Sequence, residues 1–264
     1  MNWVEKLRKL NKEFIVCVGI DPILSNIQKL GTGLSEWCKI IIDSTAEHTD
    51  AYKFQLAYFE ENGIEGLSIL KDSLDYIKSN YPDKITIGDS KRSDIGTTAT
   101  AYSKAMYDYW GFDVSTVNPY FGSDSIIPFA EKNGALIICK SSNKSSDEIQ
   151  NLKINNIYIY EKVLEIVNNC NESGNLGIVV GATYPEELQK IRSSNLDLPI
   201  LIPGLGFQGG DLNSTIQASK GGFNILNSSR GICFPKDSFN SLSHYRKAVK
   251  ESVVKFKKNI NEIN

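Results

Sequence analysis

Eight short runs of apolar and β-branched residues recur along the 264-residue chain, each closed by a polar or glycine-containing turn. They lie at residues 14–20, 51–55, 85–89, 114–118, 135–139, 177–181, 200–203 and 223–227. Apolar residues recur at helical spacing between several of them, at residues 34–48, 66–79 and 97–109. Alternating strands and helices predict a parallel sheet, and eight units in about 250 residues is typical of a (β/α)8 TIM barrel. A doubly wound open sheet is the alternative, although it typically uses fewer strands.

Three further segments complete the predicted architecture. Residues 3–14 have the apolar spacing of a short amphipathic helix, and residues 239–260 have that of a C-terminal helix with lysines on its solvated face. Residues 141–175 form a longer and more polar connection, for which we expect a mobile loop and a helix near residues 160–168. No composition break marks a boundary, so we expect a single domain over residues 1–264.

Composition excludes several classes of partner. The net charge of −2 and the pI near 5.8, without a local basic stripe, argue against nucleic-acid binding. No apolar run approaches the roughly 18 residues needed to span a bilayer, so no membrane association is expected. The five cysteines lack any Cys-x-x-Cys spacing and fall mostly in apolar segments, which indicates buried thiols in the reducing cytosol and a cytoplasmic protein.

The third run ends in an unusual group of charges, Asp89, Lys91 and Asp94. The period of two in a strand places Ile85, Ile87, Asp89 and Lys91 on one face, so a carboxylate and an ammonium share an apolar side. Burying charge there is costly unless the charges pair or take part in chemistry. An isolated Asp-x-Lys is most simply a structural ion pair, but in a TIM barrel the carboxyl ends of the strands carry the reacting groups.

The ends of the other runs are polar as well. They supply Asp21 after the first run, Lys53 and Gln55 at the second, Ser141 and Ser142 after the fifth, Pro203, Gln208 and Gly209 after the seventh, and Ser229 and Arg230 after the eighth. Loops after strands seven and eight commonly hold a phosphate with glycine amides and a cation. We therefore predict a phosphate site there, ordinary turns with a surface arginine being the alternative.

Other familiar chemistries have little support. Residues 204–209 match a dinucleotide-binding Gly-x-Gly-x-x-Gly pattern, but they follow the seventh run and no acid closes the next one, so no nicotinamide site is expected. His48 and His244 lie inside predicted helices, which argues against a Ser-His-Asp triad or a histidine metal site. No P-loop pattern is present.

The motifs at the strand ends resemble those of the orotidine 5′-phosphate decarboxylase family, in particular its longer bacterial and protozoan subgroup. The similarity spans about residues 14 to 235 and rests on residues 18–22, 53–55, 89–98, 116–122, 140–143, 180–183, 203–211 and 228–231. Related barrel enzymes that act on sugar phosphates share Asp-x-Lys-x-x-Asp, so the order of all the motifs carries the resemblance. Ser90, Ser93 and Phe207 depart from the residues frequent in the family.

The resemblance implies a homodimeric barrel without metal or organic cofactor. It implies decarboxylation of orotidine 5′-monophosphate to UMP and carbon dioxide, the last step of de novo UMP biosynthesis, with stabilisation of a C6 carbanion and protonation by Lys91. By position, the resemblance implies a catalytic charged array of Lys53, Asp89, Lys91 and Asp94, and it implies that Asp94 and Thr98 reach the partner's site. It implies that Asp21 and Gln55 lie near the ribose and that Ser141 or Ser142 lies near the pyrimidine. It places Gln208 and Arg230 at the phosphate, with Pro203, Gly209 and Ser229 in the same loops.

Two alternative functions remain at this stage. One is a Mg²⁺-dependent sugar-phosphate lyase of the same barrel superfamily, in which the carboxylates help to hold the metal, and activity in excess EDTA distinguishes it. The other is a non-catalytic phosphate-binding barrel, which would tolerate loss of one of the four charges. All four are present.

Overall fold

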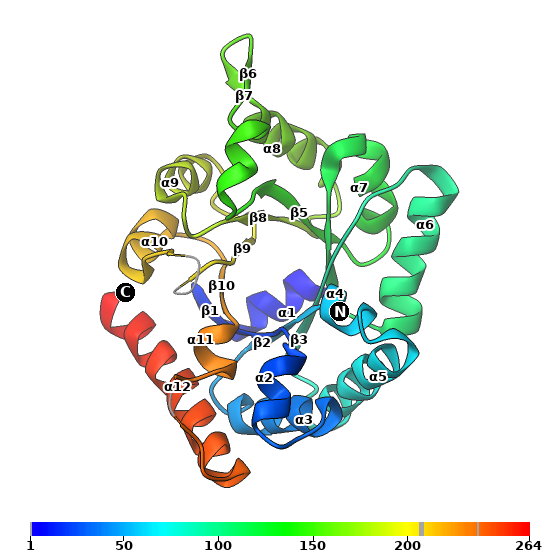
Figure 1. Ribbon diagram of the computed structural model, residues 1–264. Helices are drawn as coiled ribbons and strands as arrows, with labels where there is room; N and C mark the ends of the chain where they lie inside the picture. Colours follow the sequence, from blue (N-terminus) through cyan, green and yellow to red (C-terminus); the bar gives the residue numbers. More distant parts are fainter. Residues whose placement is uncertain (1, 206–208, 237) are drawn as a thin grey trace.

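Eight parallel strands close into a barrel in the computed structural model, which describes residues 2–205, 209–236 and 238–264 (Figure 1). The order around the barrel is β1-β10-β9-β8-β5-β4-β3-β2, so the predicted TIM barrel is confirmed and the open sheet is wrong. The strands lie within one or two residues of the predicted runs, except that β3 extends further. They are β1 Phe14–Ile20, β2 Ala51–Gln55, β3 Ile85–Arg92, β4 Val114–Val117, β5 Ala135–Lys140, β8 Leu176–Val180, β9 Ile200–Ile202 and β10 Asn224–Ser228.

Helices surround the strands and cover their outer faces (Figure 1). The outer layer contains α3 Leu34–Thr45, α5 Gly63–Asn80, α6 Gly96–Lys104, α7 Ser123–Ala130, α8 Ile159–Cys170, α9 Pro185–Ser194, α10 Leu212–Ser219 and α12 Leu242–Ile263. Shorter helices, α2 Leu24–Lys29, α4 Leu56–Glu60 and α11 Arg230–Cys233, follow strands β1, β2 and β10. A π-helical turn, η1 Ala105–Trp110, continues α6 and accounts for the helical pattern predicted up to residue 109.

Alternate strand residues build two apolar cores because successive side chains of a strand point to opposite faces. Val16 and Val18 belong to the core between the strands and the helices, whereas Ile15 and Cys17 belong to the core inside the barrel. The inner core also contains Trp3, Val4 and Leu7 of the predicted N-terminal helix α1 Trp3–Leu10, together with Ala51, Ile85, Ile87, Val114, Leu136, Val179, Leu201 and Ile225. The interior is therefore packed where α1 covers it, and this leaves the opposite end, at the carboxyl ends of the strands, for a site.

The polar connection after β5 contains more regular structure than predicted. It forms a 3₁₀ helix, Lys144–Glu148, and a projecting hairpin of β6 Lys153–Ile154 and β7 Ile157–Tyr158 before α8 (Figure 1). Asn155 and Asn156 join the two strands with φ angles of 50° and 68°. Two consecutive positive φ angles are typical of a type I′ hairpin turn, in which asparagine is favoured. The Asn-Asn pair was therefore the feature of the sequence that could have predicted this hairpin.

The helices of the described residues are not candidates for membrane spans, since none combines the necessary length and apolar character.

A buried arginine fastens α9 to the end of the barrel opposite the expected site. The guanidinium Nη1 of Arg192 donates to the carbonyls of Asn195, Leu196 and Leu198 at 2.9 to 3.0 Å. Its Nη2 donates to the Phe223 carbonyl at 3.2 Å and to Asn224 Oδ1 at 2.8 Å. One side chain thus satisfies the acceptors of the α9–β9 loop and of the start of β10.

We expect Arg192→Met to lower the free energy of unfolding by about 3 to 5 kcal/mol, because it leaves several buried carbonyl groups without donors. Urea unfolding followed by circular dichroism measures the change, and Arg8→Met, at an exposed position of α1, serves as the control. Equal stability of the two variants would contradict this role for Arg192.

Candidate active site

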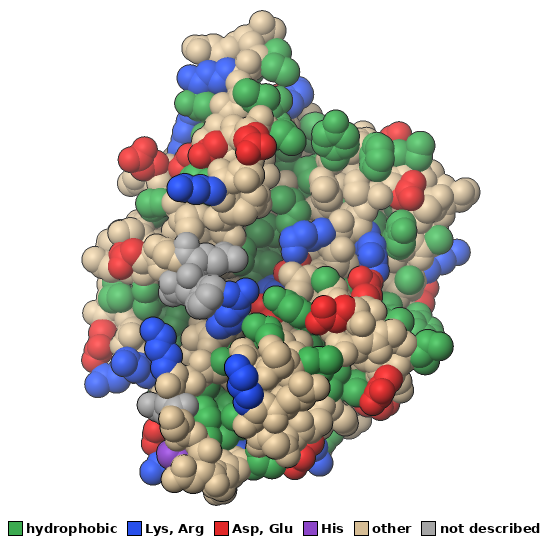
Figure 2. All heavy atoms as spheres, in the orientation of Figure 1, with side chains coloured by type: hydrophobic (Ala, Val, Ile, Leu, Met, Phe, Trp, Pro, Cys, Tyr) green, Lys and Arg blue, Asp and Glu red, His purple; other side chains and the backbone are tan. Residues whose placement is uncertain are grey.

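A cavity of about 300 Å³ opens at the carboxyl ends of the strands. Figure 2 shows this face of the molecule, with a central hollow bordered by lysine and arginine side chains. The described residues that line the cavity are Asp21, Lys53, Gln55, Asp89, Lys91, Thr116, Ile138, Ser141, Ser142, Asn143, Val179, Leu201, Pro203, Gly204, Leu205, Asn227, Ser229 and Arg230. Apolar residues of the barrel interior form part of the lining, and the polar side chains of the strand ends converge above them.

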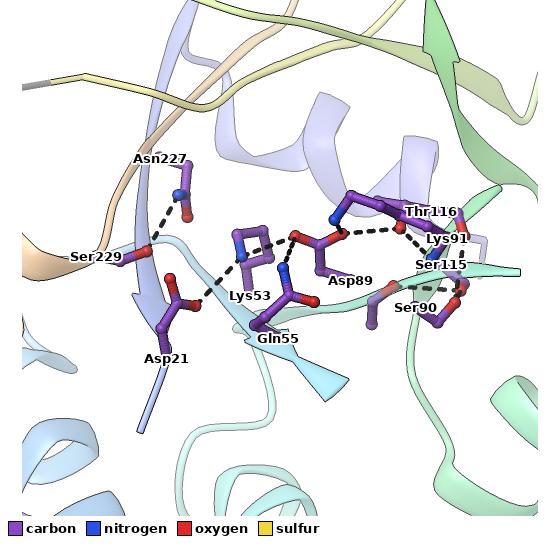
Figure 3. A network of polar contacts seen from close by, with 11 residues as sticks. Asp21, Lys53, Gln55, Asp89, Ser90, Lys91, Ser115, Thr116, Asn227 and Ser229 are labelled. Carbon is purple, nitrogen blue, oxygen red and sulfur yellow. Dashed lines mark hydrogen bonds and ion pairs between the residues drawn. The ribbon is translucent and has the colours of Figure 1, made fainter. Parts of the chain in front are cut away.

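Two lysines and two aspartates form a continuous chain of charges in this cavity (Figure 3). The Nζ atom of Lys53 lies 3.0 Å from Asp89 Oδ2 and 3.5 Å from Asp21 Oδ1. The Nζ atom of Lys91 lies 2.5 Å from Asp89 Oδ1. The charges alternate in sign, so each carboxylate or ammonium has an opposite charge beside it.

The backbone of β3 departs from regular strand geometry where Asp89 and Lys91 lie. The register with β4 shifts between Gly88 and Arg92, and Lys91 has a φ of 47°, in the left-handed region that side chains rarely adopt. The Lys91 amide donates to Thr116 Oγ1 at 2.9 Å, which holds the irregular turn against β4. Backbone strain at this position is typical of functional sites, where the surrounding structure compensates for it.

Asp89 accepts hydrogen bonds at both carboxylate oxygens. Oδ1 accepts from Lys91 and from Thr116 Oγ1 at 3.0 Å, and Oδ2 accepts from Lys53 and from Gln55 Nε2 at 3.1 Å. An ionised carboxylate offers about four acceptor positions, so the four donors use its full capacity. These donors come from β2, β3 and β4, and they fix the carboxylate in one orientation.

The charged chain holds Asp89 and Lys53 ionised. Burial would raise the pKa of Asp89, but Lys53 and Lys91 outweigh burial and hold that pKa well below its usual range. Burial would likewise lower the pKa of Lys53, but Asp21 and Asp89 outweigh it and raise the pKa above the usual lysine value. The cavity therefore carries fixed charges of both signs in a largely buried setting.

Most of the binding residues expected from the sequence meet at the cavity. Asp21, Gln55, Ser141, Ser142, Pro203, Ser229 and Arg230 all line it. We assigned no role in advance to Thr116, Asn143 or Asn227, although each lies at or just beyond the carboxyl end of a strand. Their position at the ends of strands could have identified all three as cavity residues. Thr116 and Asn143 also belong to motifs on which the resemblance rests.

Asp94, Thr98 and Gly209 do not line the cavity of their own chain among the described residues. Asp94 is half-buried and its Oδ1 accepts from the amide of Ile95 at 2.8 Å, whereas Thr98 is exposed on α6. Gly209 is exposed with a φ of 90°, and Gln208 lies outside the described residues. The array thus assembles from Lys53, Asp89 and Lys91 within one chain, whereas Asp94 lies outside the cavity on the loop after β3.

Comparison with known proteins identifies the family of this chain. Residues 15–244 match the model of the orotidine 5′-phosphate decarboxylase / HUMPS family. A Janthinobacterium protein named orotidine 5′-phosphate decarboxylase is 35% identical over 89% of this chain and 91% of its own length. A Dehalococcoides mccartyi protein of the same name is 37% identical over 94% of this chain and 99% of its own.

Solved structures give the same result. The structure of Leishmania donovani OMP decarboxylase superposes with a TM-score of 0.84 at 31% identity, covering 100% of this chain and 98% of the other. The family match extends from β1 to α12 and so includes every strand of the barrel. With its charged array at the mouth of that barrel, the chain belongs to the orotidine 5′-phosphate decarboxylase / HUMPS family.

Proposed function

We propose that this protein decarboxylates orotidine 5′-monophosphate to UMP and carbon dioxide, the last step of de novo UMP biosynthesis. The observation that carries the proposal is the Lys53, Asp89 and Lys91 array, which faces a cavity of about 300 Å³ in a chain of this family. A cavity of this size is at the lower end of those that hold small-molecule ligands. The reaction requires no electron-accepting cofactor if the protein itself stabilises the developing charge.

Lys91 is the proposed catalytic cation. Departure of carbon dioxide from C6 of the pyrimidine leaves an electron pair on that carbon with no adjacent group to delocalise it. A fixed ammonium near C6 stabilises this negative charge, and it then donates a proton to C6 to complete UMP. Lys91 is half-exposed in the cavity, so its ammonium is available to a bound ligand although it contacts Asp89.

Asp89 and Lys53 are the proposed supports of that cation. Asp89 keeps Lys91 oriented through a 2.5 Å contact, and Lys53 compensates the remaining charge of the carboxylate from the opposite side. Because four donors already hold Asp89, little reorganisation is needed when charge develops on the ligand. This preorganisation supports electrostatic catalysis.

The rest of the cavity fits a nucleoside monophosphate. We assign the ribose to Asp21 and Gln55 beside the charged array, the pyrimidine edge to Ser141 or Ser142, and the phosphate to Arg230 with the loops of Pro203 and Ser229. Strands β8 and β9 separate β5, which precedes the two serines, from β10, which precedes Arg230. The two ends of an elongated ligand would therefore contact different parts of the wall. We also assign Gln208 and Gly209 to the phosphate, as the resemblance implies.

Pairing of the carboxylates favours this reaction over a Mg²⁺-dependent sugar-phosphate lyase. Asp21 and Asp89 are both bound to Lys53, so their charges are already compensated. A non-catalytic phosphate-binding barrel would not need the strained backbone at Lys91.

We also propose a homodimer with shared active sites. Exposed apolar side chains lie on the loops after β3 and β4, at Ile95, Tyr120 and Phe121. Asp94 and Thr98 lie in the same region, outside their own cavity. An apolar surface with polar groups beside it is typical of an interface, and a second copy placed there would receive Asp94 and Thr98.

A cytoplasmic location for a single catalytic domain over residues 1–264 completes the proposal. The five cysteines are free thiols, four of them buried, as is usual in a reducing compartment.

We expect Lys91→Ala to lower kcat for decarboxylation by about a thousandfold or more, since it removes the charge that faces the carbanion. The measurement is the fall in ultraviolet absorbance as orotidine 5′-monophosphate is consumed, with EDTA in excess. Lys9→Ala, at an exposed position of α1 at the opposite end of the barrel, is the control. Loss of the wild-type activity in EDTA would favour the metal-dependent alternative, and a near wild-type rate for Lys91→Ala would remove this residue from the mechanism.

Mixing inactive variants tests the shared site. After subunit exchange, Lys91→Ala and Asp94→Ala homodimers should regain about a quarter of the wild-type activity, because random heterodimers contain one site with both residues intact. A mixture of Lys91→Ala with Lys53→Ala is the matched control, since both residues belong to one chain's site and no intact site forms. Absence of recovery in the first mixture, despite verified exchange, would contradict the shared site.

The pKa directions predict how stability depends on pH. The depressed pKa of Asp89 means that its ionised form contributes stability above about pH 4, and that this contribution is lost as the pH falls. The raised pKa of Lys53 preserves its contribution up to at least about pH 10. The difference in unfolding free energy between wild type and Asp89→Asn should therefore stay constant from about pH 5 to 9 and shrink below about pH 4. Urea unfolding at each pH measures it, and a difference that changes near neutral pH would refute the assignment.

A further inference from the structure

Lys140 is buried outside the cavity, although it carries a charge. It is the last residue of β5 and its side chain is 0% exposed. Its Nζ lies 2.8 Å from Asp147 Oδ1, 2.9 Å from Ser146 Oγ and 3.8 Å from the centre of the Tyr184 ring. Of the three buried cationic side chains among the described residues, Lys53 belongs to the active site and Arg192 to the far end of the barrel. Lys140 belongs to neither set.

The partners of Lys140 lie on the segment that follows it. Asp147 and Ser146 belong to the 3₁₀ helix Lys144–Glu148, so the ammonium holds residues 141–148 as a closed loop against the barrel wall. Ser146 Oγ donates to Tyr184 Oη at 2.8 Å, which ties the same loop to the segment after β8. The contacts of Lys140 and Tyr184 with this loop thus hold it in place from outside the cavity.

The start of this loop lines the cavity. Ser141, Ser142 and Asn143 are cavity residues, whereas Lys140 is not. Gln150 Oε1 accepts from the Ser141 amide at 2.8 Å, and Gln150 Nε2 donates to Ser141 Oγ at 2.9 Å. Ser141 Oγ in turn donates to Asn143 Oδ1 at 2.8 Å. The positions of these rim groups therefore depend on how the loop is held at Lys140 and Gln150.

The fold alone does not require a charge at Lys140. Burying an ammonium is costly, and replacing a buried ion pair by apolar residues of similar volume is often neutral or stabilising. Methionine would fill the space of the lysine stem, and Asp147 would not be left as a buried charge, because its side chain is 53% exposed. What methionine cannot supply is the hydrogen bond and ion pair that select one arrangement of the loop.

We propose that Lys140 is a positioning residue of the active site, which fixes the loop after β5 through Asp147 and Ser146 and so places Ser141, Ser142 and Asn143 for the base of a bound pyrimidine nucleotide. The inference rests on the proposed function, because it takes a pyrimidine nucleotide as the ligand. Arg230 lines the cavity from the first residue of α11, after β10, and β8 and β9 separate β10 from β5, so the phosphate end of the ligand does not depend on this loop.

The test separates the two ends of the ligand by calorimetric titration with UMP and with ribose 5-phosphate, which lacks the base. In Lys140→Met and in Asp147→Asn, we expect the Kd for UMP to rise about tenfold and the Kd for ribose 5-phosphate to change less than about twofold. An effect of this size is typical of a residue that influences a ligand through its neighbours without contacting it. The effects of the two substitutions should not add in the double variant. Amide hydrogen exchange in residues 141–151 should become faster in both variants, while the melting temperature of Lys140→Met stays equal or rises.

Asp108→Asn is the matched control. The Asp108 side chain is 55% exposed and its Oδ2 lies 2.9 Å from Lys132 Nζ. The Asp147 side chain is 53% exposed and its Oδ1 lies 2.8 Å from Lys140 Nζ. The Asp108–Lys132 ion pair, however, is remote from the loop after β5. This variant should bind both ligands as wild type does. Asp147→Asn decides the question alone if Lys140→Met fails to fold.

Three results overturn the inference, and one of them also removes the proposed function. Unchanged UMP affinity in both variants, with wild-type binding intact, shows that Lys140 does not act on the site. Equal loss of affinity for UMP and ribose 5-phosphate shows a general loss of structure rather than positioning. Failure of the wild-type protein to bind UMP removes the proposed function and this inference together.

Discussion

The active site depends on the four hydrogen bonds that hold the Asp89 carboxylate. Its donors, Lys53, Gln55, Lys91 and Thr116, come from β2, β3 and β4, so these three neighbouring strands must pair in the correct register before the carboxylate is satisfied. A buried carboxylate with fewer donors would lose much of the compensation for its desolvation. Pairing of these strands and preorganisation of the charges therefore occur together, and the two lysines are held in place by contacts of the chain itself.

The sequence predicted most of the barrel because strand and helix periodicities follow from local geometry. The period of two predicted that Ile85, Ile87, Asp89 and Lys91 share one face, and this is confirmed: the two isoleucines lie in the inner core and the two charged residues line the cavity. The irregular backbone of β3 at Lys91 was not predictable from that period. The hairpin between β6 and β7 was missed because its strands have only two residues each, too short for any periodicity. Only the Asn155-Asn156 pair indicated it.

The site could be predicted less completely, since its contacts join strands that are distant in the chain. Resemblance to a family placed Asp21, Gln55 and Arg230, and all three line the cavity. Thr116 was assigned no role, because its bond to Asp89 depends on the shifted register between β3 and β4. Burial of Lys140 was equally invisible, since a lysine at a strand end is ordinarily solvated and only the folded loop encloses it.

The N-terminal helix that covers the bottom of the barrel has a consequence for synthesis. Trp3 hydrogen-bonds to the carbonyl of Asn175, 172 residues later, and β1 pairs with β10 near the end of the chain. The residues of α1 and β1 therefore cannot be fully buried until segments about 170 to 210 residues later in the chain have been synthesised. Contacts of such long sequence separation slow folding and leave apolar segments exposed meanwhile. Nascent chains of this protein should consequently depend on chaperones until β10 has emerged.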